Sequence, residues 1–254
     1  MGATSINAAS HVKRRTPSML WRIVGVVGEL FITAGLVILL FIVWQVWWTD
    51  VGAHRQQAAA VEQVLNSWGT PESSQSSDEK IGQPRDTAPP EPEAEQEGEV
   101  FGIVRIPRFG ADYAVSIVEG TSIDLLNTGA YGHYEESQLP GEIGNFALAA
   151  HRQTYGAPLR NVDQLQEGDA IVIQTKNAYL IYKVTTHYIV WPDESDVILP
   201  VPREPGVTPT ERLLTLTTCH PPFVSDQRWI VHATFDHWVD PADGVPVELT
   251  EEVK

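Results

Sequence analysis

The segment Leu213-Leu-Thr-Leu-Thr-Thr-Cys219-His-Pro-Pro222 carries the clearest information about the fold. Leucines and β-branched threonines in a short run are typical of a β-strand. Pro221 and Pro222 lack the backbone N–H that a strand ladder needs, so we expect the strand to end at Cys219. Cys219 is the single cysteine of the 254-residue chain, which excludes an intramolecular disulfide.

Six other short apolar stretches share this character, because they contain β-branched residues and are bounded by turn-forming residues. They comprise residues 102–107, 113–118, 145–150, 170–175, 178–190 and 228–235. Short strands repeated in this way predict an all-β sandwich or closed barrel over residues 100–238. Two helical inserts are expected between the strands, at residues 122–127 and at residues 158–166, where the segment starts with proline.

A long apolar run over residues 23–48 is interrupted only by Glu29 and Gln45, and three tryptophans crowd its C-terminal end. A bilayer core needs about 20 apolar residues, whereas the apolar region of a cleaved signal peptide has about 7–15. Tryptophan is favoured at membrane–water interfaces. We therefore expect residues 23–48 to be an uncleaved, single-pass transmembrane anchor.

The flanks of this run predict its orientation. Four basic residues lie within residues 1–22, whereas only Arg55 follows the run closely. The positive-inside rule therefore places residues 1–22 in the cytoplasm and the rest of the chain outside the cell membrane, in an oxidising compartment. The net charge of −16 argues against nucleic acid as a partner, because phosphate binding needs clustered Lys and Arg.

Three segments are predicted to lie outside the folded unit. Residues 49–69 form a short helical stalk, with one apolar face made by Val61, Val64, Leu65 and Trp68. Residues 70–99 form an acidic, proline-rich linker that is expected to be disordered, because it cannot bury enough apolar surface to offset its ordering entropy. Residues 239–254 form an acidic C-terminal tail, which is expected to be solvated and peripheral.

Cys219 is the candidate nucleophile. A lone cysteine is often a buried small hydrophobe, but a free thiol at a strand end in an oxidising compartment is exposed to oxidation, which favours a reactive role. A nucleophilic thiol needs a base or a cationic neighbour. His151 is the preferred base because it follows the predicted strand 145–150, so that two strand ends can present a thiol and an imidazole at one rim of a barrel.

Other histidines compete for that role. His133, in a Gly-His-Tyr sequence, is the main rival of His151. His220 is adjacent to Cys219, but neighbouring strand residues point to opposite faces. Acyl transfer also needs a group that stabilises an oxyanion. Arg228 is the first residue of the predicted strand that follows Cys219, and a tight turn between them could place both at the same rim of the barrel. An arginine at the start of a strand is, however, usually a solvated charge.

These residues together resemble a sortase. The resemblance rests on His-Arg-Gln-Thr-Tyr-Gly-Ala-Pro at residues 151–158, Thr-Leu-Thr-Thr-Cys at residues 215–219, Arg228, and Leu-Pro-Gly-Glu-Ile-Gly-Asn-Phe at residues 139–146. Cys-His-Pro-Pro-Phe after the nucleophile makes the chain most similar to class E sortases of high-GC Gram-positive bacteria. The resemblance covers about residues 100–238 and implies a closed eight-stranded β-barrel.

The resemblance also implies a two-step transpeptidation. Cys219 would cleave a Leu-Pro-x-Thr-Gly or Leu-Ala-x-Thr-Gly sorting signal between Thr and Gly, in surface proteins that carry the signal. An amine acceptor, from a peptidoglycan precursor or from a pilin lysine, would resolve the thioester. His151 would be the general acid and base, and Arg228 would hold the oxyanion and the substrate backbone. Neither a cofactor nor a metal is expected.

Two other functional classes are less favoured by the sequence. An L,D-transpeptidase is expected to carry a Ser-His-Gly-Cys type of motif, and this chain has Leu-Thr-Thr-Cys instead. A non-enzymatic surface protein, itself anchored by a sortase, is expected to end in a sorting motif, an apolar helix and a basic tail. Residues 247–254 have none of these features.

Overall fold

The structure is a computed structural model that describes residues 19–69, 80–90 and 96–250. The chain divides into two compact units, Met1–Val46 and Trp47–Lys254. The helix α1 (Met19–Trp68) is continuous and contains Arg22–Ile42, a stretch of mean hydropathy 2.5 that is long and apolar enough to cross a membrane. This stretch fits the predicted anchor, but α1 has no break at the predicted boundary between anchor and stalk.

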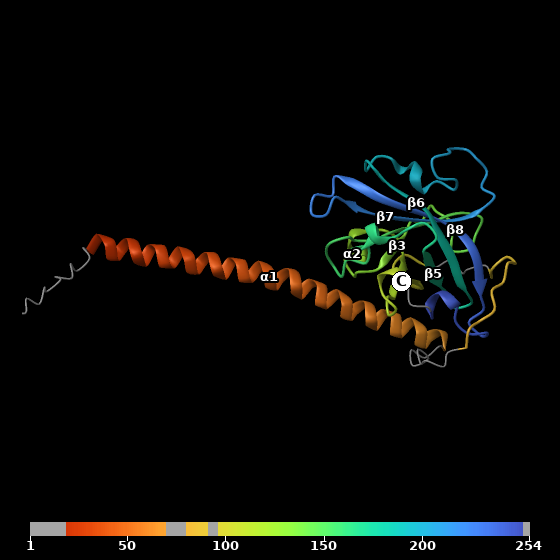
Figure 1. Cartoon of the computed structure of the whole chain (residues 1–254), viewed down its shortest axis with the longest axis horizontal. Helices are drawn as coiled ribbons and strands as arrows, with labels where there is room; N and C mark the ends of the chain where they lie inside the picture. Colours follow the sequence, from red (N-terminus) through yellow and green to blue (C-terminus); the bar gives the residue numbers. More distant parts are fainter. Residues whose placement is uncertain (1–18, 70–79, 91–95, 251–254) are drawn as a thin grey trace, which may run out of the picture. The chain divides into compact units, whose positions relative to one another are not determined.

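Eight strands form a closed barrel in the order β1-β2-β3-β4-β7-β8-β6-β5. Figure 1 labels β3, β5, β6, β7 and β8 of this barrel. The predicted eight-stranded, all-β barrel is therefore confirmed. The strands are β1 (Val100–Arg105), β2 (Val115–Glu119), β3 (Tyr131–His133), β4 (Gly144–Ala149), β5 (Ala170–Gln174), β6 (Tyr179–Val190), β7 (Arg212–His220) and β8 (Gln227–Val239).

Most neighbouring strands are antiparallel, but β2 pairs with β3 and β4 pairs with β7 in parallel. The barrel interior is filled by large side chains, among which Tyr131, Phe146 and Tyr182 are fully buried. Burial of one such side chain contributes roughly 1.5–3 kcal/mol relative to leaving it exposed. The apolar face of each strand thus fixes which residues point inward, and the strand ends are left to carry polar chemistry.

Only one of the two predicted helical inserts is an α-helix. The insert at residues 122–127 contains α2 (Ile123–Leu126) and begins at Ser122. The prediction for residues 158–166 is wrong, since this segment has a single 3₁₀ turn, η3 (Val162–Gln164). Its apolar residues Leu159, Val162 and Leu165 are all buried and recur every third position, a spacing that aligns side chains in a 3₁₀ turn. Two more 3₁₀ turns are η2 (Pro107–Phe109) and η4 (Ser195–Ile198).

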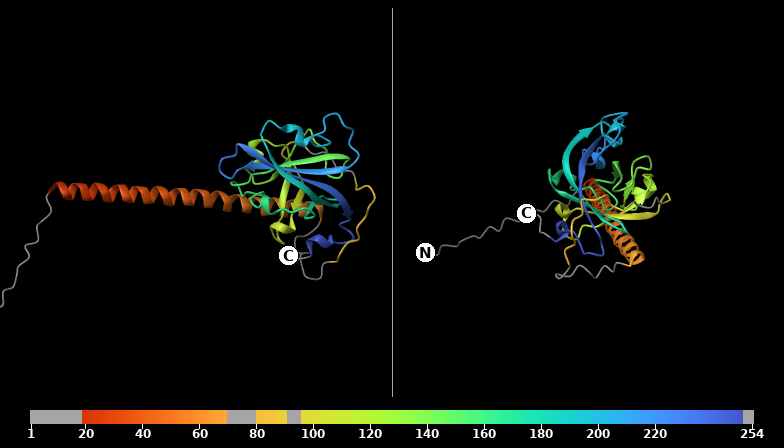
Figure 2. Two further views of the ribbon diagram at one scale, coloured as in Figure 1. Left: turned by 45° about the horizontal axis from the view of Figure 1, so that its top comes forward. Right: turned by 90° about the vertical axis from the view of Figure 1, so that its right-hand side faces the viewer.

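The predicted stalk packs on the barrel. Val61 and Leu65 of α1 are each 3% exposed and lie against Ile103 of β1. The amide of Gln57 donates to the carbonyl oxygen of Thr128 and accepts hydrogen bonds from the backbone and hydroxyl of Ser116. These contacts join the last turns of α1 to the barrel within the second compact unit (Figure 2).

The prediction of a disordered linker over residues 70–99 is wrong for residues 80–90. Arg85 pairs with Trp238 through the backbone, and its guanidinium lies 4.7 Å from the centre of the Trp238 ring. The same guanidinium forms ion pairs with Asp240 at 3.2 Å and Asp243 at 2.6 Å. Charge pairing and backbone bonds therefore order a segment that has little apolar surface of its own. Residues 70–79 and 91–95 lie outside the described part.

The C-terminal segment is also more ordered than predicted. β8 extends to Val239, and Val245 is 8% exposed where it pairs with Ile81. The 3₁₀ turn η5 (Val247–Leu249) follows, and Glu248 within it forms an ion pair with Lys183 of β6. The expectation of a solvated, peripheral tail is thus wrong for residues 239–250, because apolar side chains and an ion pair attach them to the sheet. Residues 251–254 lie outside the described part.

Trp238 provides a test of how strongly residues 80–90 bind to the barrel. Its side chain is 6% exposed, and its indole N–H donates to the carbonyl oxygen of Thr87 at 3.0 Å. We expect Trp238→Ala to lower the free energy of unfolding of the full chain by about 3–5 kcal/mol in chemical denaturation followed by circular dichroism.

Trp191→Ala is the matched control, because Trp191 is 57% exposed. Its effect should stay within about 0.5 kcal/mol. Equal effects of the two substitutions would contradict a buried, bonded Trp238.

Candidate active site

Cys219 and Arg228 face each other across two neighbouring strands. The prediction that β7 ends at Cys219 is wrong by one residue, because Cys219 pairs with Arg228 and His220 still pairs with Gln227. The ladder continues to His220 because the first missing backbone N–H belongs to Pro221. Paired residues on antiparallel strands have their side chains on the same face. The thiol, which is partly exposed, and the guanidinium therefore occupy neighbouring positions.

His151 follows β4 and reaches the same rim of the barrel. Ala149 of β4 pairs in parallel with Thr217 of β7, and the backbone N–H of Ala150 donates to the carbonyl oxygen of Thr217. The hydroxyl of Thr218 donates to the carbonyl oxygen of Ala150 at 2.7 Å. This register, continued for two residues beyond Ala149, places His151 level with Cys219. The topology brings together the three residues singled out in the sequence.

The His151 ring has two partners that the sequence did not indicate. Its Nε2 donates to the side-chain oxygen of Asn127 at 2.9 Å, and its ring stacks on Tyr155 with 5.4 Å between the centroids. The neutral ring therefore carries its proton on Nε2 and its lone pair on Nδ1. His151 is half-buried, and burial lowers its pKa below the ordinary value of 6.5.

Arg228 is held by the chain that precedes it. Its Nη1 donates to the backbone carbonyl oxygens of Ser225 at 2.9 Å and Gln227 at 2.8 Å. Within the described residues, its Nε and Nη2 make no hydrogen bond. An arginine has five donors in a fixed fork, so donors remain for an anionic group beside Cys219.

A hydrogen bond joins the two residues that follow Cys219 and His151. Arg152 Nη1 donates to Nδ1 of His220 at 2.8 Å, and the guanidinium lies 5.2 Å from the centre of the Trp229 ring. Arg152 is only 6% exposed, and its Nε makes no hydrogen bond within the described residues. His220 is therefore engaged by Arg152.

His133 and His232 have structural partners. His133 lies in β3, is 2% exposed, and binds Glu119 through Nδ1 at 2.8 Å. His232 bonds to the hydroxyls of Tyr188 and Thr215. Burial, with a smaller contribution from the charge of Arg203, lowers the pKa of His232 to about 4. These contacts favour His151 over its main rival.

Asn127, Tyr155 and Arg152 are the site residues that sequence reasoning missed. Tyr155 and Arg152 lie inside the quoted run at residues 151–158, next to the predicted base. Their place near His151 was therefore visible in the sequence, although their contacts were not. Asn127 ends the helical insert as the C-cap of α2, and no local pattern connects it with a histidine 24 positions away.

Comparisons with known proteins agree on one family. The family model described as a sortase domain matches residues 104–236. The chain is 34% identical over 233 residues to sortase SrtE1 of Streptomyces coelicolor, which covers 89% of this chain and 61% of that protein. It is 35% identical over 228 residues to sortase SrtE2 of the same organism, covering 86% and 84%. The chain thus spans about three fifths of the length of SrtE1.

Solved structures give the same result. The SrtA sortase from Actinomyces oris is 44% identical with a TM-score of 0.63, over 65% of this chain and 96% of that one. Sortase E1 from Streptomyces coelicolor, with a tripeptide in its active site, is 36% identical with a TM-score of 0.56, over 61% and 99%. Both identities are high enough to relate the sequences as well as the folds.

The lowered pKa of His151 predicts how the folded chain responds to acid. We expect the His151 ring to take up its second proton at a pH below 6.5 in a nuclear magnetic resonance titration of the imidazole groups, with His151→Gln identifying the signal. The unfolded chain then binds more protons than the folded chain once the pH drops below about 6.5.

The contribution of His151 to stability should accordingly be present above pH 6.5 and decrease as the pH falls toward its folded pKa. His151→Gln should remove this part of the pH dependence of unfolding. A titration midpoint at or above 6.5 would show that a neighbouring negative charge, rather than burial, dominates at this ring.

Proposed function

This chain belongs to the sortase family, whose members are cysteine transpeptidases, and we propose that Cys219 transfers a sorting-signal-bearing protein to an amine acceptor. The observation that carries this proposal is the position of Cys219 on β7. It is paired with Arg228 on one side and level with His151 on the other. A relative that holds a tripeptide in its active site supports a peptide substrate.

In the first step, the thiolate of Cys219 attacks the carbonyl carbon at the scissile bond, and the carbonyl oxygen becomes an oxyanion. The free donors of Arg228 stabilise this charge as it develops. His151, in its protonated form, donates a proton to the leaving amine as the carbon–nitrogen bond breaks. The products are a thioester on Cys219 and the released C-terminal peptide.

In the second step, the neutral His151 ring removes a proton from the incoming amine, which attacks the thioester carbon. A second tetrahedral oxyanion forms beside Arg228 and collapses to an amide, with Cys219 as the leaving thiolate. The proton remains on His151, so the pair returns to its starting state. The reaction exchanges one amide bond for another and needs no oxidant or reductant.

The substrate we propose is a Leu-Pro-x-Thr-Gly or Leu-Ala-x-Thr-Gly sorting signal, cleaved between Thr and Gly. The similarity to SrtE1 and SrtE2 supports a class E sortase, and the class E resemblance implies alanine at the second position. The acceptor we propose is an amine of a peptidoglycan precursor, which would anchor surface proteins to the cell wall. A pilin lysine as acceptor would instead make the protein a pilin polymerase.

The apolar part of α1 supports a membrane-bound enzyme. Arg22–Ile42 meets the length and composition of a single membrane span, and basic residues precede it. By the positive-inside rule, the barrel would lie on the extracytoplasmic side. This is where sorting signals and wall precursors are presented, so the proposed location agrees with the proposed reaction.

Variants at the three residues test the assigned roles. Cys219→Ala should abolish both cleavage of a fluorogenic Leu-Ala-x-Thr-Gly peptide and the acyl-enzyme adduct seen by mass spectrometry. His151→Ala and Arg228→Lys should each lower kcat by about 100-fold or more, because they remove proton transfer and the forked oxyanion donor respectively.

His187→Ala is the control, because His187 is exposed on β6. It should retain activity close to that of the parent. Turnover by Cys219→Ala would disprove the nucleophile assignment, and a larger loss in His187→Ala than in His151→Ala would disprove the choice of imidazole.

We also propose that Arg152 and His220 hold the two catalytic strand ends at a fixed spacing. Arg152→Gln and His220→Ala should each reduce kcat about 10-fold, and the double variant should be little worse than either, because both remove the same hydrogen bond. His220→Asn keeps an acceptor and should restore most of the activity.

Measuring kcat, KM and the midpoint of thermal unfolding for each variant separates a positioning role from a general loss of stability. A positioning role predicts that kcat falls while KM and the midpoint of thermal unfolding stay near the parent values. Additive losses, or losses that follow the unfolding midpoint across the four variants, would show that the pair acts only through stability.

A further inference from the structure

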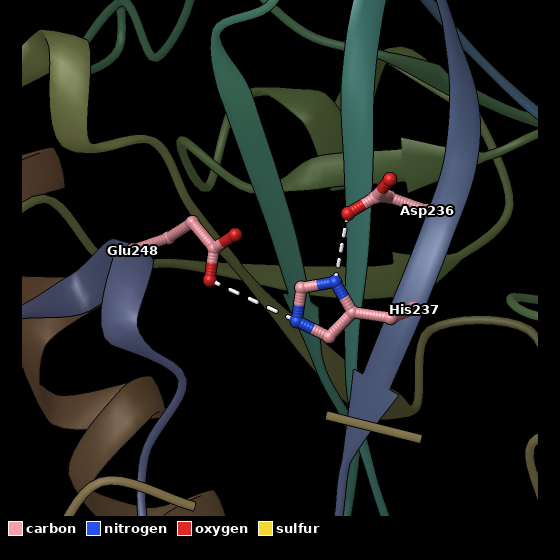
Figure 3. A group of neighbouring side chains, drawn as sticks. All are labelled: Asp236, His237 and Glu248. Carbon is pink, nitrogen blue, oxygen red and sulfur yellow. Dashed lines mark hydrogen bonds and ion pairs between the residues drawn. The ribbon is translucent and has the colours of Figure 1, made fainter. Parts of the chain in front are cut away.

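A bulge near the end of β8 brings two neighbouring polar side chains together. Tyr182 of β6 pairs with Phe235 and Ile181 pairs with His237, so Asp236 is an extra residue in the ladder. Adjacent strand residues normally point to opposite faces, but a bulge redirects side chains. Here the carboxylate of Asp236 accepts a hydrogen bond from His237 Nδ1 at 2.8 Å (Figure 3).

This hydrogen bond determines which ring nitrogen of a neutral His237 is available. Because Nδ1 carries the proton that Asp236 accepts, Nε2 carries a lone pair. Nε2 points toward the carboxylate of Glu248 in η5, and its distance from Glu248 Oε2 is 3.9 Å (Figure 3). The side chains of His237 and Glu248 are 12% and 13% exposed, so the gap between them is shielded from solvent.

Only one of the two oxygens of the Glu248 carboxylate has a hydrogen-bond partner within the described residues. Oε1 accepts a hydrogen bond from Lys183 Nζ at 3.1 Å. Oε2 is buried and has no hydrogen-bond partner within the described residues. A buried polar atom without a partner is costly, and this one faces the lone pair of an imidazole. Two electron-rich atoms that face each other across a shielded gap favour a positive charge between them.

We propose that Asp236, His237 and Glu248 form a binding site for a divalent transition-metal ion, with Zn²⁺ as the representative ion. His237 Nε2 and Glu248 Oε2 are the direct ligands, water completes the coordination, and Asp236 orients the imidazole. Zinc lies about 2.0–2.2 Å from nitrogen and carboxylate ligands, so the present 3.9 Å gap accommodates an ion in a bent arrangement. Carboxylate–histidine–zinc arrangements of this kind raise the basicity of the ligand.

The chemistry of the donors selects the ion. Imidazole nitrogen suits zinc and its neighbours in the first transition series. Calcium and magnesium prefer sites built wholly from oxygen. The three groups each offer a donor atom within 4.8 Å of the others. The alternative to a metal ion in this gap is a second proton on His237. That proton would make the ring an imidazolium, which would lie between the carboxylates of Asp236 and Glu248.

The ion would connect the end of β8 to the C-terminal segment that follows it, through two ligands eleven positions apart in sequence. His237 belongs to β8, and Glu248 lies in the C-terminal segment, where Val245 pairs with Ile81. His237 and Arg228 are separated by nine positions on β8, or about 30 Å of extended strand. Binding should therefore stabilise the attachment of residues 80–90 and 239–250 without taking part in the reaction at Cys219.

Titration of the full, untagged chain with Zn²⁺ in detergent tests the site. The Cys219→Ala background is used throughout, so that the catalytic thiol does not bind zinc. Isothermal titration calorimetry should show one ion that is lost in both His237→Gln and Glu248→Gln. Asp236→Asn should weaken binding about 10- to 100-fold, as is typical when an orienting carboxylate is removed. Zn²⁺ should raise the unfolding midpoint of the parent and not that of His237→Gln.

His187→Gln is the matched control, since His187 is an exposed histidine on neighbouring β6, and its binding should equal that of the parent. Equal binding by the parent and the His237→Gln and Glu248→Gln variants would place zinc elsewhere and overturn the proposal. No binding, together with ¹⁵N imidazole shifts that show both His237 nitrogens protonated at neutral pH, would identify the proton as the occupant. Each result is independent of whether the chain cleaves a sorting signal.

Discussion

The two ladders of β7 are the constraint on which the candidate active site depends. β7 pairs in parallel with β4 and antiparallel with β8. The C-terminal end of β4, the C-terminal end of β7 and the N-terminal end of β8 must therefore emerge at the same rim. This geometry brings His151, Cys219 and Arg228 together although they are far apart or separated by a loop in sequence. A slip of one residue in either ladder would move a side chain to the opposite face.

Polar contacts refine what the ladders establish. The Thr218 hydroxyl binds the Ala150 carbonyl directly before His151, and Asn127 holds the far side of the His151 ring. Arg152 is costly to bury, because its guanidinium is shielded and its nearest carboxylate, on Asp163, is 3.4 Å away and 53% exposed. A charge-assisted bond contributes about 1.5–3 kcal/mol, whereas an unsatisfied buried donor costs about 1–3 kcal/mol. Net stability therefore does not explain this arrangement, which fits instead the proposed role of Arg152 and His220 in spacing the two strand ends.

Much of this arrangement could be predicted from the sequence, because strands and their ends are encoded locally. Seven of the strands have a recognisable run of β-branched residues, and the position of His151 after one of them favoured it over His133. The eighth strand, β3, has only three residues and contains Gly132, where a side chain would collide with the carbonyl oxygen of Gly120. The ordered residues 80–90 were also missed, since Arg85 binds partners more than 150 positions away. Long-range charge pairing leaves no periodic pattern in either partner.

The order of residues 80–90 changes the role of the segment that was predicted to be a linker. A spacer extends between two bodies, and its reach depends on freedom at both ends. Here Gln57 of α1 is bonded to β2 and to Thr128, and Arg85 is bonded to the end of β8 and to its acidic continuation. Both ends of the connection therefore belong to the same compact unit. The connection between Gln57 and Arg85 therefore starts and ends on one body, which distinguishes it from a spacer between two bodies.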